Sequence, residues 1–360
     1  MHSARFPRDM MRFPLRTTFA SCALIVATAA TISAQSSTDT APRKKAPDSA
    51  QKAAGKSTRY SAKRAKAPHD TTPAKPKGLT GQALRDSILD SMWPVKGPDQ
   101  LPGAILPSKR VVAFYGNILN KRMGVLGEYE PDDMLHRLDE EVAAWAKADP
   151  ATPVVPALHF IAVVAQASAG QDGKYRARMD NAVIERVMTL AKRRDAIVFL
   201  DLQVGLSTLR DEIPRLAPFL MRPNVHLGID PEFSMKNGGL PGKKIGTYDA
   251  SDVNYATEFL ADLVTKNNLP PKILVVHRFT KAGLTNYKNI KLDPRVQVVI
   301  DMDGFGPPEL KKGTFHNYIK AEPVQFVGWK QFFKPRNDNP RTTIAEILRL
   351  WPRPFYIQYQ

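Results

Sequence analysis

From residue 109 onward, short apolar runs alternate with segments in which apolar residues recur every three or four positions. The runs have the length and composition of buried strands. They cover residues 110–116, 153–161, 196–203, 225–230, 272–279, 296–302, 323–330 and 354–359. Most of the segments between them have helical spacing, as from Pro131 to Lys147. Strands that alternate with helices predict a parallel sheet with right-handed crossovers.

Polar residues mark where several of these helices should begin. Asp180, Ser207 and Ser251 are the expected N-caps, because short polar side chains accept hydrogen bonds from the first amides of a helix. Thr343 and Glu346 have the spacing of a capping box. The helix expected after Ser207 contains a proline, so it should be kinked.

The number of strands decides the expected architecture. A doubly wound sheet usually has a glycine-rich phosphate turn after its first strand, whereas here that strand ends Phe114-Tyr115-Gly116-Asn117. The sequence also lacks a Walker motif and the G-x-S-x-G motif of serine hydrolases. Eight strands within residues 109–360 fit a single closed (β/α)8 barrel of the TIM type. Closure would pair the last strand with the first and leave no free edge.

The chain before the barrel divides into three segments. Residues 1–34 combine a basic start, an apolar run and small residues, which predicts an export signal peptide; an uncleaved anchor is the alternative. Cys22, the only cysteine, lies at the start of that run and would be lost on cleavage. Residues 35–78 are rich in Ala, Lys, Pro, Ser and Thr and predict a disordered basic linker. Residues 79–108 predict a short helix over 79–93 and an extended lead-in.

The net charge of +17 is concentrated in the first part of the chain. Residues 1–78 contain 15 Lys/Arg and 4 Asp/Glu, so they contribute +11 and the remaining 282 residues contribute +6. The charge therefore does not indicate a folded surface specific for nucleic acid. The basic linker could bind an anionic cell-envelope surface through charge alone, and a soluble spacer is the alternative.

Three of the apolar runs end in two polar residues spaced two apart. The pairs are Asp201/Gln203, Asp230/Glu232 and Asp301/Asp303. Residues two apart in a strand point to the same face, and the carboxyl ends of barrel strands carry active sites. Crowded carboxylates repel one another, which raises the pKa of some of them. The pairs therefore predict an enzyme-like pocket at the C-terminal mouth of the barrel.

The other strand ends complete the expected site. They supply Tyr115, Asn117, His159, His277, Lys330, Tyr356 and Gln358. Each has a structural alternative: a lone histidine is often a core residue, the lysine could be the ion-pair partner of an aspartate, and the tyrosines could fill the mouth. Further aromatic residues suit stacking on sugar rings or, alternatively, packing in cores. They are Phe233, Tyr248, Phe279, Phe305 and Trp329.

Three strings in this part of the chain resemble an uncharacterised family of exported bacterial (β/α)8-barrel proteins. They are VVAFYGN at 111–117, GIDPEF at 228–233 and VIDMDGFGPP at 299–308. The resemblance covers roughly residues 109–360 and implies the fold and export; the family carries no established activity.

Asp230-Pro231-Glu232 also resembles the D-x-E strand end of family 18 chitinases and family 25 muramidases. The resemblance implies that Glu232 is the proton donor and that Asp230 assists it. The chain departs from the chitinase pattern at Gly228, where those enzymes have a further aspartate.

The leading hypothesis is a secreted, retaining-type glycoside hydrolase or a related carbohydrate-active enzyme whose substrate is a polysaccharide or other glycan. Glu232 would be the acid. Asp230, Asp301 or Asp303 would stabilise developing positive charge, and the remaining polar residues of the mouth would bind hydroxyl groups. This hypothesis involves no cofactor and no metal ion.

Two alternatives remain open. One is a metal-dependent hydrolase, for example of phosphodiesters, that uses His159, Asp201, His277 and Asp301. The first strand lacks the H-x-H signature of many metal-dependent barrels, which favours glycoside hydrolysis. The other alternative is a non-catalytic barrel that binds a polysaccharide.

Overall fold

The computed structural model describes Trp93, residues 97–360 and five residues between 81 and 91. The barrel belongs to the compact unit that contains residues 93–360. In the second unit, residues 26–92, the described residues are helical, as expected for this segment; they are Gly81, Ala83, Leu84, Ser87 and Ser91. The expected signal peptide and basic linker lie outside the described residues.

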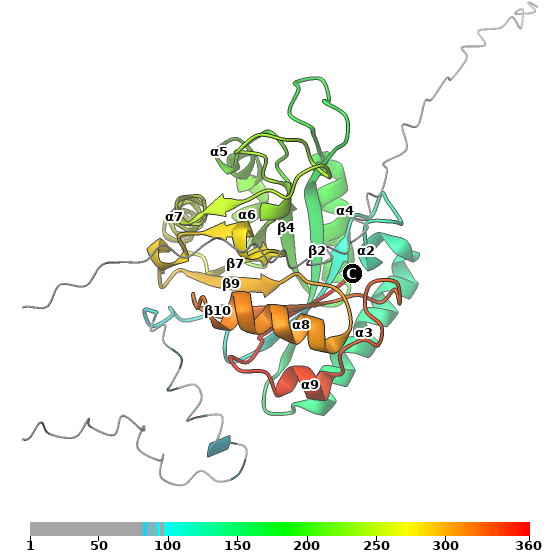
Figure 1. The fold of residues 1–360 in the computed structure, drawn as a ribbon, viewed down its shortest axis with the longest axis vertical. Coiled ribbons are helices and arrows are strands. Elements are labelled where there is room, and N and C mark those ends of the chain that lie inside the picture. The colour runs from blue at the N-terminus through cyan, green and yellow to red at the C-terminus, as the bar shows by residue number, and fades with distance from the viewer. Residues whose placement is uncertain (1–80, 82, 85–86, 88–90, 92, 94–96) are drawn as a thin grey trace, which may run out of the picture. The chain divides into compact units, whose positions relative to one another are not determined.

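Eight parallel strands form a closed barrel, as predicted (Figure 1). They are β1 (Arg110–Gly116), β2 (Val154–Ala165), β4 (Ile197–Leu202), β5 (Val225–Ile229), β7 (Lys272–Arg278), β9 (Val296–Met302), β10 (Phe326–Gln331) and β11 (Tyr356–Tyr359). Each strand pairs with the next in this order, and β1 closes the ring by pairing with both β11 and β2. The fold is therefore a (β/α)8 barrel of the TIM type.

Strand β2 is longer than expected, because the apolar run continues to Ala165. The short strand β3 (Arg176–Arg178) pairs antiparallel with its last residues, from Val163 to Ala165. This pairing satisfies backbone groups beyond the barrel ring and extends β2 four residues past the expected end. Two further short strands, β6 (Tyr248–Asp249) and β8 (Leu284–Thr285), form a separate parallel pair.

Helices connect the strands and pack around the barrel (Figure 1). The α-helices are α2 (Val125–Glu128), α3 (Pro131–Ala148), α4 (Asn181–Lys192), α5 (Leu209–Glu212), α6 (Ala217–Leu220), α7 (Ala250–Asn267), α8 (Pro308–Thr314) and α9 (Ile344–Leu348). A π-helical segment, Phe315–Lys320, continues α8. No helix in the described part of the chain is long and apolar enough to cross a lipid bilayer.

Two of the expected helix starts are wrong by one or two residues. Thr208 caps α5 by accepting from the amide of Asp211, while the Ser207 hydroxyl donates to a buried glutamate instead. Asp249 caps α7, and Ser251 is already inside the helix. In both places a neighbouring side chain competes for the same amide groups. Thr343 forms its capping box with Glu346, as predicted.

The helix that contains the proline is not merely kinked but divided. Helix α5 ends at Glu212, a 3-10 segment follows over Ile213–Leu216, and α6 then begins at Ala217. Pro214 lies in the 3-10 segment, where its missing amide removes an intrahelical hydrogen bond.

The apolar core has two parts because side chains alternate along each strand. Val112 and Phe114 belong to the larger core outside the barrel, between strands and helices. Val111 and Ala113 point the other way and belong to the smaller core inside the barrel. The inner core also contains Phe199 from β4. It fills the amino-terminal part of the barrel and supports the side chains nearer the carboxyl ends of the strands.

Candidate functional site

The inward face of the barrel changes from apolar to polar towards the carboxyl ends of the strands. On β4 the inward positions run Ile197, Phe199, Asp201, and on β9 Val299 is followed by Asp301 two residues later. Other strands show the same change. It places Tyr115, His159, His277, Lys330 and Gln358 beside these aspartates, and all are nearly inaccessible. The polar layer therefore rests directly on the inner apolar core.

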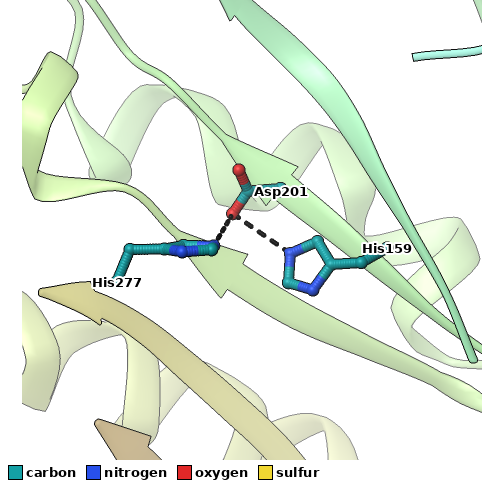
Figure 2. Close-up of side chains that lie close together, drawn as sticks. All are labelled: His159, Asp201 and His277. Atoms are coloured by element: carbon teal, nitrogen blue, oxygen red, sulfur yellow. Dashed lines mark ion pairs between the residues drawn. The ribbon is translucent and has the colours of Figure 1, made fainter. Parts of the chain in front are cut away.

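The centre of the layer is the carboxylate of Asp201, which lies between two imidazoles (Figure 2). His159 Nε2 is 3.4 Å and His277 Nε2 is 3.5 Å from the same oxygen, Asp201 Oδ1. The Tyr115 hydroxyl donates to the other oxygen, Oδ2, at 3.1 Å. All four side chains are at most 2% exposed. Among the described residues, His159, Asp201 and His277 are the group whose ligand atoms lie close enough together, within 4.8 Å, to hold a metal ion. We call these three residues the trio.

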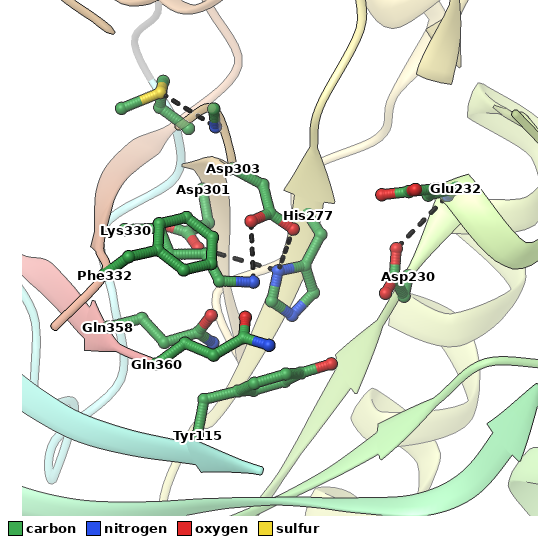
Figure 3. A network of polar contacts seen from close by, with 12 residues as sticks. Tyr115, Asp230, Glu232, His277, Asp301, Asp303, Lys330, Phe332, Gln358 and Gln360 are labelled. Atoms are coloured by element: carbon green, nitrogen blue, oxygen red, sulfur yellow. Dashed lines mark hydrogen bonds and ion pairs between the residues drawn. The ribbon is translucent and has the colours of Figure 1, made fainter. Parts of the chain in front are cut away.

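A second group of contacts links His277 to the next strands (Figure 3). His277 Nδ1 is 3.2 Å from Asp303 Oδ2, and the other oxygen of Asp303 is 2.7 Å from the Lys330 ammonium group. Asp301 Oδ2 lies 3.7 Å from the same imidazole nitrogen. Lys330 also lies over the ring of Tyr115, 4.5 Å from its centroid. The layer thus continues as a chain of alternating charges.

Asp230 and Glu232 occupy the end of β5, apart from that chain (Figure 3). Asp230 Oδ1 accepts from the backbone amide of Glu232 at 3.2 Å and so caps the 3-10 turn Pro231–Phe233. Gln203 donates to Asp230 Oδ2 at 3.3 Å. Glu232 is half-buried. Among the described residues, no hydrogen bond or ion pair reaches its carboxyl group, so that group remains available to another molecule.

The balance between burial and cationic neighbours divides the carboxyl groups into two classes. In the first class, burial dominates. It raises the pKa of Glu232 to about 8, and the neighbouring charges of Asp230 and Asp303 add to this effect. Burial likewise raises the pKa of Asp230 to about 7, although His277 opposes it, and raises the pKa of Asp301 to about 7. These three groups can hold protons near neutral pH.

The second class is ionised. Burial would raise the pKa of Asp201, but the two histidines outweigh it and lower the pKa below the ordinary value. For Asp303, burial is likewise outweighed, by Lys330 and His277, so its pKa is also lowered. Burial lowers the pKa of His159 to about 4. The site therefore combines protonated and ionised carboxyl groups, which is the arrangement that acid–base enzymes use.

Two glycines make room for the aspartates. A Cβ atom on Gly228 of β5 would lie 2.4 Å from both Asp201 Oδ1 and His159 Nε2. A Cβ atom on Gly328 of β10 would lie 2.4 Å from Asp301 Oδ1. Sequence reasoning did not identify this role, and found in Gly228 only a departure from the chitinase pattern. A glycine on a barrel strand next to an inward carboxylate would have been the signal.

Several residues predicted from strand ends are already engaged. The Asn117 amide donates to the Ile161 carbonyl, and its oxygen accepts from the Leu119 amide, so both groups serve the backbone. Tyr356 and Gln358 contact each other and His159 inside the barrel.

Two of the aromatic residues expected to suit sugar stacking are not exposed at the mouth. Tyr248 and Trp329 pack in the outer core and are at most 2% exposed, because their strands direct them towards the helices. Phe279 and Phe305 follow β7 and β9 and stack on each other at 5.8 Å between centroids. Phe305 is 36% exposed and therefore accessible.

Comparison with known proteins yields similarities to solved structures. No protein-family model and no curated protein matches the chain. Among solved structures, the chain is similar to a ruminal GH26 endo-beta-1,4-mannanase, with 12% sequence identity and a TM-score of 0.35. The similarity covers 80% of this chain and 64% of the mannanase chain, so this chain spans less than two thirds of that protein's length.

Proposed function

We propose that the protein is an exported carbohydrate-active enzyme, a glycoside hydrolase that acts on a polysaccharide or other glycan with Glu232 as its general acid. The observation that carries the proposal is the position of Glu232. Its carboxyl group sits at the end of β5, at the mouth of the barrel, with no partner among the described residues. An acid that must donate a proton to a substrate oxygen needs such a position.

The surrounding charges suit a positively charged transition state. Glycoside hydrolysis passes through an oxocarbenium-like state that a nearby carboxylate stabilises. Asp303 is held ionised by Lys330 and His277, and we assign this stabilising role to it, with Asp230 and Asp301 as further candidates. Asp230 also fixes the turn that carries Glu232, so it acts on the acid through the backbone. Phe279 and Phe305 offer an accessible aromatic surface for a sugar ring.

The test is the substitution Glu232→Gln, assayed against a panel of polysaccharides and aryl glycosides. Gln keeps the shape of the side chain and removes the proton, so hydrolysis of a natural glycan should fall roughly 10²–10⁴-fold. An aryl glycoside with a weakly basic leaving group needs little protonation and should lose much less. Glu309→Gln is the matched control, because Glu309 is an exposed glutamate in α8.

Two results would contradict this proposal. One is full hydrolysis of the best glycan by the Glu232→Gln protein. The other is a wild-type protein that binds glycan fragments in calorimetry and never cleaves them, which would identify a binding barrel. A substrate found by the panel would also give the linkage and the stereochemical outcome directly.

A further inference from the structure

Inside the barrel, three buried side chains place atoms that have no hydrogen-bond partner close to one another (Figure 2). His159 Nε2, His277 Nε2 and Asp201 Oδ1 form no hydrogen bond with the described residues. The two nitrogens lie 3.4 and 3.5 Å from the shared oxygen, and the residues are at most 1% exposed. Buried polar atoms without partners are costly, so the convergence calls for an occupant.

We propose that His159, Asp201 and His277 bind a divalent transition-metal ion of the Zn²⁺ type beneath the mouth of the barrel. The site is separate from the glycoside hydrolase chemistry proposed for Glu232 and does not depend on it. Asp301 is not a ligand, because it approaches His277 from Nδ1, on the other side of the ring.

The distances from the two imidazole nitrogens to Asp201 Oδ1 suit such an ion, and all three atoms lie within 4.8 Å of one another. Zn–N and Zn–O bonds of about 2.0–2.1 Å place neighbouring ligand atoms of a tetrahedral site about 3.3 Å apart. The two contacts to Asp201 Oδ1, 3.4 and 3.5 Å, are close to that value and too long for good hydrogen bonds. Two imidazoles and one carboxylate form a donor set that binds Zn²⁺ and Fe²⁺.

The Nδ1 atoms of the two imidazoles have different neighbours. His159 Nδ1 is hydrogen-bonded to the Tyr356 hydroxyl at 2.5 Å. His277 Nδ1 lies 3.2 Å from Asp303 Oδ2 in an ion pair, without the geometry of a hydrogen bond. Metal-binding histidines normally donate this second N–H to a carboxylate or another acceptor, which leaves the lone pair of Nε2 for the ion. The His159 ring therefore has such a partner, and His277 has a carboxylate close to the same atom.

The hydroxyl of Tyr356 can accept from His159 when it has an acceptor of its own. The Gln358 side-chain amide lies 2.9 Å from that hydroxyl, and its Oε1 atom has no partner among the described residues. The two ends of an amide are interchangeable by rotation. In the structure the Gln358 nitrogen Nε2 donates to the hydroxyl. With the amide turned the other way, Oε1 would accept from Tyr356, and the hydroxyl would be free to accept from His159 Nδ1.

The carboxylate is held in the same way, and its surroundings are kept open. Tyr115 donates to Asp201 Oδ2, so Oδ1 alone faces the two nitrogens. Gly228 passes so close that any side chain there would collide with Asp201 Oδ1 and His159 Nε2. The glycine and the tyrosine thus support the same site.

The experiment measures metal content in the full-length protein, purified without a polyhistidine tag. The wild type is equilibrated with Zn²⁺ or Co²⁺, passed over a desalting column and analysed by mass spectrometry of the elements. We expect one ion per chain, visible absorption from the Co²⁺ form, and a melting temperature that falls when a chelator removes the ion. Asp201→Asn and His277→Gln should abolish stoichiometric binding.

Three further variants make the result specific. Tyr356→Phe keeps the packing of the ring but removes the support of His159, so affinity should fall about 10–100-fold. His136→Gln, at an exposed histidine paired with Glu140, and Glu232→Gln should both bind like the wild type. If the Asp201→Asn and His277→Gln proteins fail to fold, the metal affinity of Tyr356→Phe tests the proposal in their place.

A wild type that takes up no stoichiometric ion and melts unchanged with chelator would overturn the proposal. The trio would then be held by a proton on His277 between Asp201 and Asp303. Wild-type affinity in Asp201→Asn, His277→Gln or Tyr356→Phe would overturn it equally. None of these outcomes bears on hydrolysis by Glu232, which the Glu232→Gln assay measures separately.

Discussion

The carboxyl group of Glu232 carries a stability cost that its proposed role explains. Its pKa rises from an ordinary value of 4.5 to about 8 in the folded chain, chiefly through burial, with Asp230 and Asp303 adding to the shift and Lys330 and His277 opposing it. A carboxyl group with a raised pKa favours the fold while it is protonated. As pH rises from about 4.5 to about 8, the unfolded chain ionises first and stability is lost.

This linkage gives a prediction that is independent of any substrate. Glu232→Gln cannot ionise, so the difference between its melting temperature and that of the wild type should increase from about pH 5 to about pH 8 and then level off, with the variant melting higher at pH 9. Glu309→Gln, at an exposed position in α8, is the matched control. Calorimetry at several pH values, with metal content held constant, measures the difference. A constant difference across this range would mean that Glu232 is not perturbed by burial.

Individual site residues could be predicted only where the sequence also predicts which strand positions point into the barrel. Asp201, Asp301 and Asp303 follow apolar runs at a spacing of two, and alternation alone places them inside the barrel. His159 was expected at a strand end but lies in mid-strand, because β2 continues to Ala165 and its last residues pair with β3. The convergence on Asp201 Oδ1 depends on ring orientations that no spacing encodes.

Strands β5 and β10 contribute to the site through glycines, whose missing side chains leave room for the aspartates. Gly228 and Gly328 occupy inward positions, where a Cβ atom would lie 2.4 Å from a carboxylate oxygen in each case. Gly228→Ala and Gly328→Ala should each destabilise the fold by about 1–3 kcal/mol, as overpacking does in other cores.

Chemical denaturation measures both changes, and a glycine in a helix provides the control. Gly313 lies in α8, where an added Cβ atom would meet nothing within 4 Å. Gly313→Ala should therefore stabilise the protein by roughly 0.5–1 kcal/mol, because glycine is a poor helix former. Equal midpoints for Gly228→Ala and the wild type would show that the layer of aspartates can move aside.

Elements as a whole were more predictable than their ends. All eight barrel strands lie where apolar runs predict them, because a strand buried on both faces is mostly apolar along its length. The helix starts at Thr208 and Asp249 were missed because several polar residues occur together there, and local hydrogen bonding selects among them. The short pair β6 and β8 has no sequence signature of its own.

At the scale of the whole molecule, closure of the barrel brings residues distant in sequence into one layer. Tyr356 and His159 are 197 positions apart, and their contact exists only because β11 pairs with β1 and β1 with β2. Closure was predictable from the number of strands and the absence of a phosphate-binding turn. Which inward side chains then touch was not, because that depends on the stagger of the ring.

The basic N-terminal part of the chain leads to the last prediction. Residues 35–78 contain 11 Lys/Arg and 3 Asp/Glu, a net charge of +8 on a segment poor in large apolar residues. We propose that this segment holds the exported barrel near an anionic cell-envelope surface.

Such attraction is screened, with a Debye length of about 10 Å at 0.1 M salt. A protein that begins at residue 79 should keep the melting temperature of a protein that begins at residue 35 and lose its binding to anionic vesicles. Binding of the longer protein should fall steeply with added salt, as measured by vesicle co-sedimentation. A truncated protein that melts earlier would make the segment part of the fold, and one that still binds equally well would place the tether on the barrel.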